Sequence, residues 1–453
     1  MIYLIAFTSF LFILLNLKLS NNDWFDPSVI FSLIFFVQSI FCILALSYLK
    51  LQFHSEVLMI LLISFLIFSI VSLLSKSRFK TRTFYKLSDR STVLNQRPMS
   101  MPSIITIVTI LSFIVLTFVR YKLLGDVASA YGEGGISLSE KIALYDNLTK
   151  FHIETYNRLG VSLPRYYGLL NAVAYALGYL IIYESVHNYI LTKKIKILNM
   201  ITILLMLIFM YFGGSRSTIF RVITCAGVIY YILYMKDNID FKRYRKLIVK
   251  ILLYGILVVV LFMASISLYG RTNNFNLFHY LFIYIGAPLY NLDSFIQHYN
   301  LPIQSDLFGK QTFYSWYSYL GSKTSNINYI YSLDLPFLKY SSEYSLGNVY
   351  TTFYQFLYDF SYKGIAPLVI VIATYYVFSY DKLKKMPLTS DFEFSLFLYA
   401  FLFNDLIMLF FSNRFYETIL SIGNIRMLVI TFFLGNYIYN GYIKIFNIKF
   451  NLR

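Results

Sequence analysis

The residues best suited to chemistry lie between two apolar stretches, in the run Tyr211-Phe212-Gly213-Gly214-Ser215-Arg216-Ser217-Thr218. A new apolar stretch starts directly after the glycine pair, so we expect Arg216 at the amino terminus of a helix, where unpaired backbone amides attract negative charge. Ser215 or Ser217 can cap that helix and leave other amides free for an anion. Because a planar guanidinium matches two phosphate oxygens, the run is typical of a diphosphate site. The alternative is an arginine that anchors the helix at the membrane interface.

Five further arginines stand near the ends of apolar stretches, on the side of the membrane where we place Arg216. Arg271 opens a long loop, and the other four flank shorter segments (Arg158, Arg165, Arg414 and Arg426). An arginine at membrane depth costs up to a few kcal/mol, so each one either anchors at lipid headgroups or binds something anionic. Together they predict positive charge around the outer mouth of a helix bundle, which suits a lipid-linked diphosphate.

Acidic side chains that could act as a general base toward a sugar hydroxyl lie in the same long loop as Arg271 (Glu343, Asp359 and Asp293). A solvated or ion-paired carboxylate is the alternative for each of them. The histidines on that side do not stand at metal-ligand spacing from one another, so no metal site is expected (His152, His279 and His298). The sequence also lacks a nucleophile elbow, a P-loop and a dinucleotide-binding motif.

The composition places these residues in a membrane protein. Of the 453 residues, 58% are apolar and 13% are charged, whereas soluble proteins average about 25% charged residues. The formal charge of +17 comes from lysines and arginines in short segments between apolar stretches, which indicates membrane topology and argues against nucleic-acid binding. Cys42 and Cys225 both lie inside apolar stretches, so neither a disulfide framework nor a metal cluster is expected. No cofactor is predicted.

Eleven apolar stretches have about the twenty residues that a membrane-spanning helix needs. They predict an all-α integral membrane protein with a single membrane domain over residues 1–453. The first stretch lacks the basic start and the cleavage site of a signal peptide, so we expect it to remain as a helix. The stretches cover residues 2–19, 28–49, 56–74, 102–120, 164–191, 197–213, 217–235, 248–268, 364–380, 393–411 and 426–443.

The basic residues predict the orientation of these stretches. Segment 75–101 holds seven lysines and arginines against the single acid Asp89, so we place it in the cytoplasm. The amino terminus is then outside, and the first short loop, with Asp23 and Asp26, faces the cytoplasm. More than half of the basic residues fall in five segments that this topology places inside, 75–101, 193–196, 236–250, 382–385 and 444–453.

Two outer loops, 121–163 and 269–363, are too long to be simple connectors. In the first, Ser137-Leu138-Ser139-Glu140 is a capping box, followed by apolar residues at helical spacing. We expect an amphipathic helix on the outer membrane surface, entered through a flexible glycine segment (Gly132, Gly134 and Gly135). In the second loop, the apolar piece 278–296 predicts a buried or re-entrant helix. The tyrosine-rich sequence beyond it offers flat surfaces for sugar rings.

Three short motifs and this architecture resemble the Wzy-type oligosaccharide repeat-unit polymerases, which include the O-antigen polymerases. The motifs are Gly213-Gly214-Ser215-Arg216, Gly347-Asn348-Val349-Tyr350-Thr351, and Tyr358-Asp359-Phe360-Ser361-Tyr362-Lys363-Gly364. The sequence departs from the family in two places. Ser215 stands where some relatives have threonine, and Ser361 stands where glycine is common, which is expected to alter the turn before the stretch at 364–380.

The resemblance implies an inverting glycosyl transfer on the periplasmic face of the bacterial inner membrane. A growing glycan on undecaprenyl diphosphate is the donor, a single lipid-linked repeat unit is the acceptor, and a chain-length regulator protein is an implied partner. Arg216 and Arg271 would stabilise the departing diphosphate without a metal, and Glu343 is our choice of general base. The remaining predicted substrate-binding residues are Gly214, Ser215, Asn348, Tyr350, Asp359, Arg158, Arg165, Arg414 and Arg426.

Two other functions stay open. An O-antigen ligase would use the same donor and would favour a catalytic histidine in the long loop, where His279 and His298 lie. A lipid-linked oligosaccharide flippase or transporter would also use a basic cavity between helices, but it is expected to show internal repeats, and none is visible. The sequence leaves the sugar composition, the linkage and the oligomeric state undetermined.

Overall fold

The computed structural model of the protein describes residues 1–79, 97–214, 216–236, 242, 244–251, 253, 255, 277–303, 307–324, 333–342, 344–386, 391–445 and 448–451. The predicted span at 248–268 lies almost entirely outside these residues. So do three of the predicted site residues, Ser215, Arg271 and Glu343.

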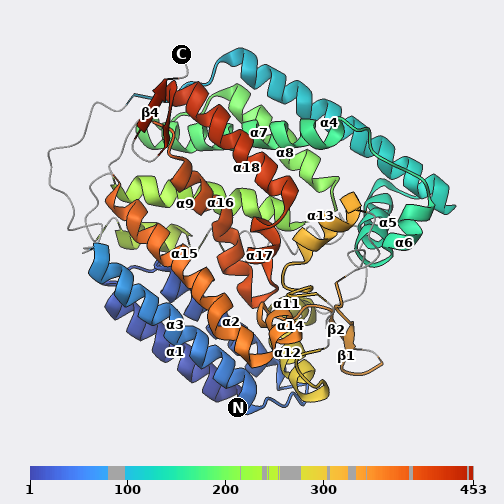
Figure 1. The fold of residues 1–453 in the computed structure, drawn as a ribbon, viewed down its shortest axis with the longest axis vertical. Coiled ribbons are helices and arrows are strands. Elements are labelled where there is room, and N and C mark those ends of the chain that lie inside the picture. The colour runs from blue at the N-terminus through green and yellow to red at the C-terminus, as the bar shows by residue number, and fades with distance from the viewer. Residues whose placement is uncertain are drawn as a thin grey trace. The chain divides into compact units, whose positions relative to one another are not determined.

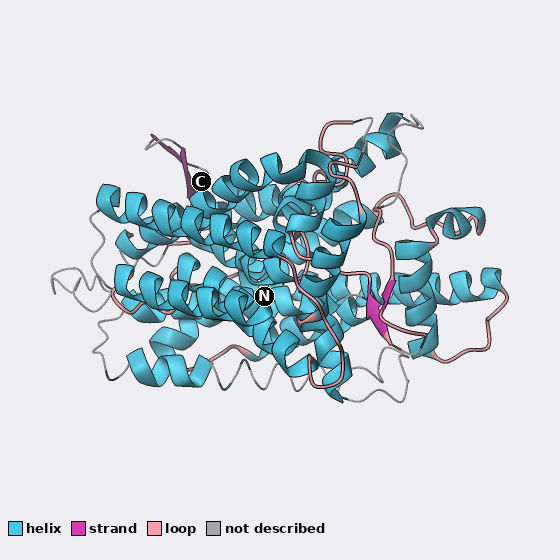
Figure 2. Ribbon diagram, turned by 90° about the horizontal axis from the view of Figure 1, so that it is seen from below, coloured by secondary structure: helices cyan, strands magenta, loops and turns pink. Residues whose placement is uncertain are grey.

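Most of the described chain is helical (Figure 2), as the sequence predicts. Eight helices in this part of the chain are long and apolar enough to cross a membrane. They are α1 (Ile2–Leu19), α2 (Pro27–Ala45), α3 (Ser55–Phe79), α4 (Ser103–Tyr131), α7 (Tyr167–Thr192), α9 (Arg216–Lys236), the α14 to α15 segment (Phe353–Lys385), and α18 with its π-helical end (Ile422–Asn440). Two shorter apolar helices are α8 (Ile197–Tyr211) and the α16 segment (Phe394–Phe410). The count of eleven spans stays a prediction.

The apolar helices turn large hydrophobic side chains outward. On α4, the side chains of Ile104 and Phe118 are 70% and 67% exposed. A water-soluble protein seldom exposes a continuous apolar stripe of this kind, whereas lipid requires one. The structure is therefore that of a helical, membrane-embedded protein with several membrane crossings.

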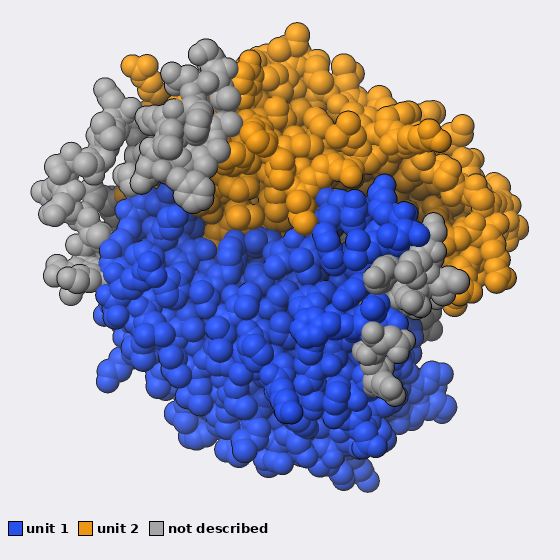
Figure 3. All heavy atoms as spheres, in the orientation of Figure 1, with its two compact units in different colours: residues 1–87, 274–386, 402–422 blue, residues 88–273, 387–401, 423–453 orange. Residues whose placement is uncertain are grey.

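The described chain divides into two compact units, which Figure 3 colours separately. Unit 1 comprises residues 1–87, 274–386 and 402–422, and unit 2 comprises residues 88–273, 387–401 and 423–453. Figure 1 labels the helices of both, and each unit is described by itself below. The single membrane domain expected from the sequence stays a prediction.

Unit 1 has a helical core in which α1 packs on α2 and α15 (Ile365–Lys385) packs on α3. Aromatic side chains fill the space between α2 and α3, where the rings of Phe31 and Phe68 stack with centroids 4.1 Å apart. Asp26 starts α2 as its amino-terminal cap, and Pro27 follows at the first helical position, where proline has no hydrogen bond to lose.

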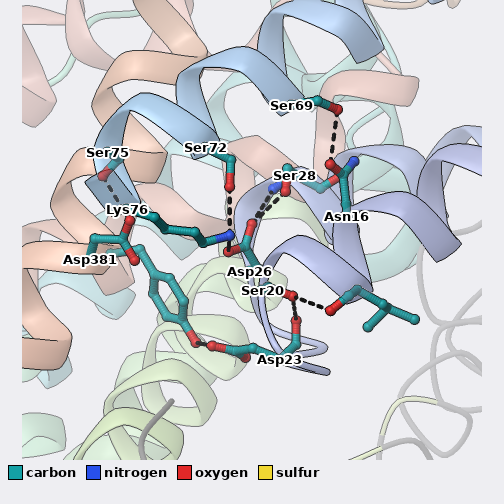
Figure 4. A network of polar contacts seen from close by, with 12 residues as sticks. Asn16, Ser20, Asp23, Asp26, Ser28, Ser69, Ser72, Ser75, Lys76 and Asp381 are labelled. Carbon is teal, nitrogen blue, oxygen red and sulfur yellow. Dashed lines mark hydrogen bonds and ion pairs between the residues drawn. The ribbon is translucent and has the colours of Figure 1, made fainter. Parts of the chain in front are cut away.

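A buried network of charged and hydroxyl side chains joins one end of these helices (Figure 4). Lys76 of α3 pairs with Asp26 at 2.9 Å. Lys384 of α15 lies 3.3 Å from Asp23 and 3.1 Å from Asp381. The loop between α1 and α2 therefore lies at the same end of unit 1 as the lysines that close α3 and α15, as the predicted topology requires.

The segment before α14 contains the buried helix that the sequence predicts, but the helix is broken. α11 (Leu277–Ile285) and α12 (Ala287–His298) meet at Gly286, and Pro288 cannot donate a backbone hydrogen bond there. The Gln38 side-chain amide donates to the carbonyl oxygens of Ile285 and Phe410, each at 2.9 Å. The break is thus compensated by a polar side chain from α2. α13 (Tyr314–Thr324) and the short hairpin of β1 (Leu338–Lys339) and β2 (Ser345–Gly347) follow.

The turn between α14 (Phe353–Phe360) and α15 has an unusual backbone at Ser361, with φ 54° and ψ −159°. Side chains other than glycine rarely adopt this conformation, which costs about 1 to 3 kcal/mol. Ser361 therefore holds the turn in a conformation that glycine favours, at a cost in backbone strain.

In unit 2, α4 continues to Tyr131, eleven residues beyond the apolar stretch that the sequence predicts, so the segment from residue 121 begins as helix. The limits of the first outer loop stay a prediction. The helix continues because Leu124 packs against Ile142 of the next helix in a buried cluster. Gly132, with φ +93°, ends α4 in the left-handed conformation that glycine favours.

The amphipathic helix predicted in the first outer loop is present as α5 (Leu138–Phe151). Its capping box is formed, since the Ser137 hydroxyl accepts from the Glu140 amide and the Glu140 carboxylate accepts from the Ser137 amide. The position of α5 on the membrane surface stays a prediction. The other elements of the described chain are α6 (Ile153–Arg158), α17 (Arg414–Ile419), and the hairpin of β3 (Tyr442–Ile445) and β4 (Ile448–Asn451).

Candidate functional site

The glycine pair of the predicted anion site forms the turn that separates α8 from α9. The Gly213 amide donates to the Met210 carbonyl at 3.0 Å, and the Gly214 amide donates to the Tyr211 carbonyl at 3.1 Å. Gly214 has a φ of +73°, and α9 begins at Arg216. The residue types therefore place the guanidinium at a helix amino terminus, as we expected from the sequence.

Helix α5 packs directly on this turn through Asp146, which the sequence analysis missed. A Cβ atom on Gly214 would lie 3.0 Å from the Cβ of Asp146. Asp146 is buried, with 5% of its surface exposed. Because Asp146 contacts Gly214, which lies two residues before Arg216, its carboxylate limits how much positive charge the site presents. One signal was available, since Asp146 lies four residues after Ile142 and so shares the buried face of α5.

Three other predicted arginines lie in unit 2 with Arg216. Arg426, in the first turn of α18, has its Nη1 atom 3.6 Å from where a Cβ on Gly168 would lie. Arg165 is exposed three residues before Gly168, so Arg165 and Arg426 both lie near the start of α7. Arg158 lies 4.0 Å from Glu154 one turn away, and both side chains are more than 80% exposed. An exposed ion pair of this kind does not support the prediction that Arg158 binds substrate.

In unit 1, the predicted substrate residue Asp359 holds a neighbouring segment in place. Its carboxylate accepts from the backbone amides of Gln311 and Thr312 at 3.2 Å and 2.6 Å. The Asn413 side chain donates to the Thr312 carbonyl at 2.9 Å and reinforces the same segment. A carboxylate committed to two amides is a poor general base, so the geometry favours the structural alternative for Asp359.

The other predicted residues of unit 1 also have internal partners. Tyr350 is 3% exposed, and its hydroxyl donates to the Pro336 carbonyl at 2.8 Å, so its ring is not open to a sugar. Arg414 forms an ion pair with Glu417 at 3.3 Å. Asn348 is half-buried and follows Gly347, which ends β2 with φ +73°.

Asp293, the remaining candidate base that is described, is bound to His54. His54 Nδ1 lies 2.8 Å from one carboxylate oxygen, and the His54 amide donates to the other at 2.9 Å. Burial raises the pKa of the Asp293 carboxyl, although the hydrogen bonds from His54 act in the opposite direction. This is the ion-paired alternative that the sequence analysis left open.

The histidines that keep the ligase alternative open differ in their surroundings. His279 is 7% exposed and packs edge-on against Tyr344 with ring centroids 4.8 Å apart. Burial lowers the pKa of its imidazole. His298 Nδ1 lies 2.7 Å from the Ser294 carbonyl oxygen of its own helix. Across the described residues, no group of three His, Cys, Asp or Glu side chains is arranged to hold a metal ion.

A cavity of about 200 Å³ lies at the other end of α7 from Gly168. Its lining includes Ser185, Asn188, Lys196 and Asn199. Lys196 pairs at 2.9 Å with Glu184, which is fully buried and also accepts from the Met101 amide and the Tyr439 hydroxyl. These contacts tie four helical segments together, so the cavity belongs to a structural joint and is small for a lipid-linked glycan.

No protein-family model, curated protein or solved structure matches this chain. The fold defines the class of a helical protein with several membrane crossings. The corner of unit 2 formed by Gly214, Arg216 and Asp146 is the candidate site with chemistry suited to an anion.

Proposed function

We propose that the protein joins lipid-linked oligosaccharide repeat units into a surface polysaccharide. The observation that carries the proposal is Arg216 at the first turn of α9, directly after a turn that requires glycine at position 214. A helix amino terminus with a guanidinium suits a diphosphate leaving group. The membrane-crossing helices suit a substrate carried on a long polyprenyl chain.

In the proposed reaction, a hydroxyl of the acceptor sugar attacks the anomeric carbon of the donor glycan. The bond between that carbon and the diphosphate oxygen breaks, and the configuration at the carbon inverts. The hydroxyl proton passes to a base, for which Glu343 remains our choice. Arg216, the amides of its helix and Arg271 stabilise the negative charge that grows on undecaprenyl diphosphate. The positive-inside rule predicts that this site faces away from the cytoplasm, which supports a periplasmic reaction.

The test is a comparison of surface glycans from cells with a deletion of the gene and from cells that carry single variants. Deletion should leave a glycan with one repeat unit. Arg216→Ala and Arg271→Ala should each slow polymerisation about 100-fold to 1,000-fold, since each removes a contact to developing charge. Lys18→Ala, at an exposed lysine of α1, is the control and should give wild-type ladders on a gel.

Two results would contradict the proposal. Wild-type ladders from both arginine variants, at normal protein levels, would contradict the proposed diphosphate-binding role of Arg216 and Arg271. Loss of single repeat units as well as long chains in the deletion strain would indicate a ligase or a flippase, because a polymerase acts after the first unit is available for transfer.

A further inference from the structure

Arg120 is a half-buried cation of unit 2 to which the proposed reaction assigns no role. It lies on α4, which is one of the membrane-crossing helices. Its guanidinium lies over two aromatic rings, 5.3 Å from the centroid of Tyr145 and 5.6 Å from that of Tyr167. Its Nη1 atom donates to the Tyr145 hydroxyl at 2.9 Å. Ionisable side chains that face the interior of a membrane protein commonly mark a ligand path.

The surroundings of Arg120 leave hydrogen-bonding capacity unused. Its Nε atom, the hydroxyl of Tyr167 and the Oδ1 atom of Asn171 are all buried and have no hydrogen-bond partner. Tyr167 is 5% exposed. Tyr167 and Asn171 lie four residues apart on α7, so their side chains point along the same face of that helix. Buried polar groups nearly always have partners in native proteins, so two unpaired groups on side chains that lie against each other, Arg120 and Tyr167, and a third one turn along α7 at Asn171 indicate a missing ligand.

The charge of this place identifies the kind of ligand. Within the described part of the chain, Arg120 forms no ion pair with a carboxylate, and the side chains that contact it are the neutral tyrosines Tyr145 and Tyr167. Burial of a cation without an anion is costly. Arg120 Nε and the Tyr167 hydroxyl can both donate to an oxyanion, and the Asn171 amide can do so by rotating its nitrogen inward. A phosphoryl group meets all of these demands.

Arg120 also belongs to the same corner of unit 2 as the Gly214 turn. Tyr121, its neighbour on α4, packs edge-on against Phe212 with centroids 6.3 Å apart. Tyr145, its hydrogen-bond partner on α5, precedes the Asp146 that touches Gly214. Arg120 is therefore linked to the turn through Tyr121 on α4 and through Tyr145 and Asp146 on α5.

We propose that Arg120, with Tyr145 and Tyr167, binds a phosphoryl group of the lipid-linked diphosphate whose other contacts include Arg216. This assignment rests on the proposed function for the identity of the lipid. Arg120 is a binding residue, and its aromatic neighbours hold the guanidinium so that little side-chain freedom is lost when the lipid binds.

The experiment measures lipid binding by the full-length protein in phosphatidylcholine nanodiscs. The probes are undecaprenyl diphosphate and, as the other source of a phosphoryl group, phosphatidylglycerol. The readout is the rise in the thermal unfolding midpoint as each lipid is titrated. Arg120→Gln should weaken binding of undecaprenyl diphosphate roughly tenfold to a hundredfold, as expected for loss of a hydrogen bond to a charged group. Lys122→Gln, at an exposed lysine two residues away, is the matched control and should bind like the wild type.

Two milder variants keep the test decisive if Arg120→Gln does not fold. Arg120→Lys keeps the charge without the planar guanidinium, and Tyr167→Phe keeps the ring without the hydroxyl. Both variants should bind undecaprenyl diphosphate more weakly than the wild type does. Without lipid, both should have the unfolding midpoint of the wild type. Wild-type affinity in these variants would overturn the assignment. Equal stabilisation by phosphatidylglycerol would overturn it too, because the site would then hold a bulk lipid headgroup.

The lipid-binding test of Arg120 and the gene-deletion test of the proposed function can fail independently of each other. If gene deletion does not produce a one-repeat glycan but Arg120→Gln still loses undecaprenyl diphosphate, the function is wrong and the binding site stands. If deletion produces the one-repeat glycan and Arg120→Gln binds the lipid normally, the function stands and Arg120 has only a structural role.

Discussion

Gly214 is the residue at which the candidate site depends most directly on backbone geometry. Its φ of +73° lies in the left-handed region, and a Cβ atom at this position would lie only 3.0 Å from the Cβ of Asp146. Both conditions favour glycine over residues with a side chain. The same small residue therefore turns the chain between α8 and α9 and allows α5 to approach the amino terminus of α9.

We expect Gly214→Ala to destabilise the protein by about 1 to 2 kcal/mol from the backbone conformation alone, and to reduce polymer formation because α5 must move away. The measurements are thermal unfolding of the purified protein and glycan ladders from complemented cells. Gly227→Ala is the matched control, since Gly227 lies within α9 with open space around its Cβ position. This control should be neutral or stabilising by roughly 0.5 to 1 kcal/mol. Equal behaviour of the two variants would contradict the role of the turn.

At the residue scale, the sequence predicted the features that depend on neighbouring residues alone. A glycine pair interrupts a helix, so the next residue, Arg216, starts a new one. Asp146 and Arg120 were missed because their importance comes from contacts between α5, α4 and the turn, which no local pattern contains. Asp359 and Tyr350 match motifs, but the structure uses the carboxylate and the hydroxyl to hold backbone groups. A motif match cannot tell these two uses apart.

At the scale of elements, the end of unit 1 that carries Asp26 is held by buried charges. Burial alone would raise the pKa of the Asp26 carboxyl, but the charges of Lys76 and Lys384 and a hydrogen bond from Ser28 outweigh burial and lower the pKa below its usual 3.8. A carboxyl with a lowered folded pKa adds stability above its unfolded pKa and loses that contribution as the pH falls through its folded pKa. The joint between α2 and α3 should therefore weaken in acid.

We expect the unfolding midpoint of the wild-type protein to fall when the pH drops below about 4, as Asp26 takes up a proton. Asp26→Asn should be less stable at neutral pH by about 3 to 5 kcal/mol, because Lys76 loses its buried partner, and should lose less stability in acid. Thermal unfolding across the pH range checks both statements. Asp126→Asn, at an exposed carboxylate of α4, makes the same charge change and should keep the wild-type pH profile. An unchanged acid dependence in Asp26→Asn would refute the assignment.

The elements themselves were predictable where their signals are local. The capping box of α5 formed as expected, because both hydrogen bonds join residues three apart. The apolar stretch at 102–120 did not indicate that α4 continues for eleven more residues, since packing against α5 extends the helix there. The break at Gly286 was also missed, because its cost is offset by Gln38, which lies 247 residues away from Ile285 in the sequence.

At the scale of the whole molecule, the question is which ends of the helices share a side of the membrane. In unit 1, the ends of α1 and α15 meet in the buried network, so Lys18 and Lys385 must lie on one side. The distribution of basic residues predicts that this side is cytoplasmic and that the loop with Gly135 lies outside.

We expect single cysteines at Lys18 and Lys385 to react with a membrane-impermeant maleimide only after spheroplasts are opened, whereas Gly135→Cys should react in intact spheroplasts. The natural thiols of Cys42 and Cys225 are fully buried, so the background should be low. Opposite responses at Lys18 and Lys385 would contradict the fold of unit 1. A complete reversal, with Gly135→Cys protected, would contradict the charge-based orientation and the periplasmic site.

The contact between Asp23 and Lys384 also determines the order in which the protein can be completed during synthesis. The two residues are 361 positions apart. At roughly 5 to 20 residues per second, a ribosome needs roughly 20 to 70 seconds to make the intervening chain. Asp26 meets Lys76 within the first three helices, but Asp23 must wait for α15. The first three helices are therefore synthesised before α15, the helix that supplies Lys384 to Asp23, and their packing is completed only when α15 has been made.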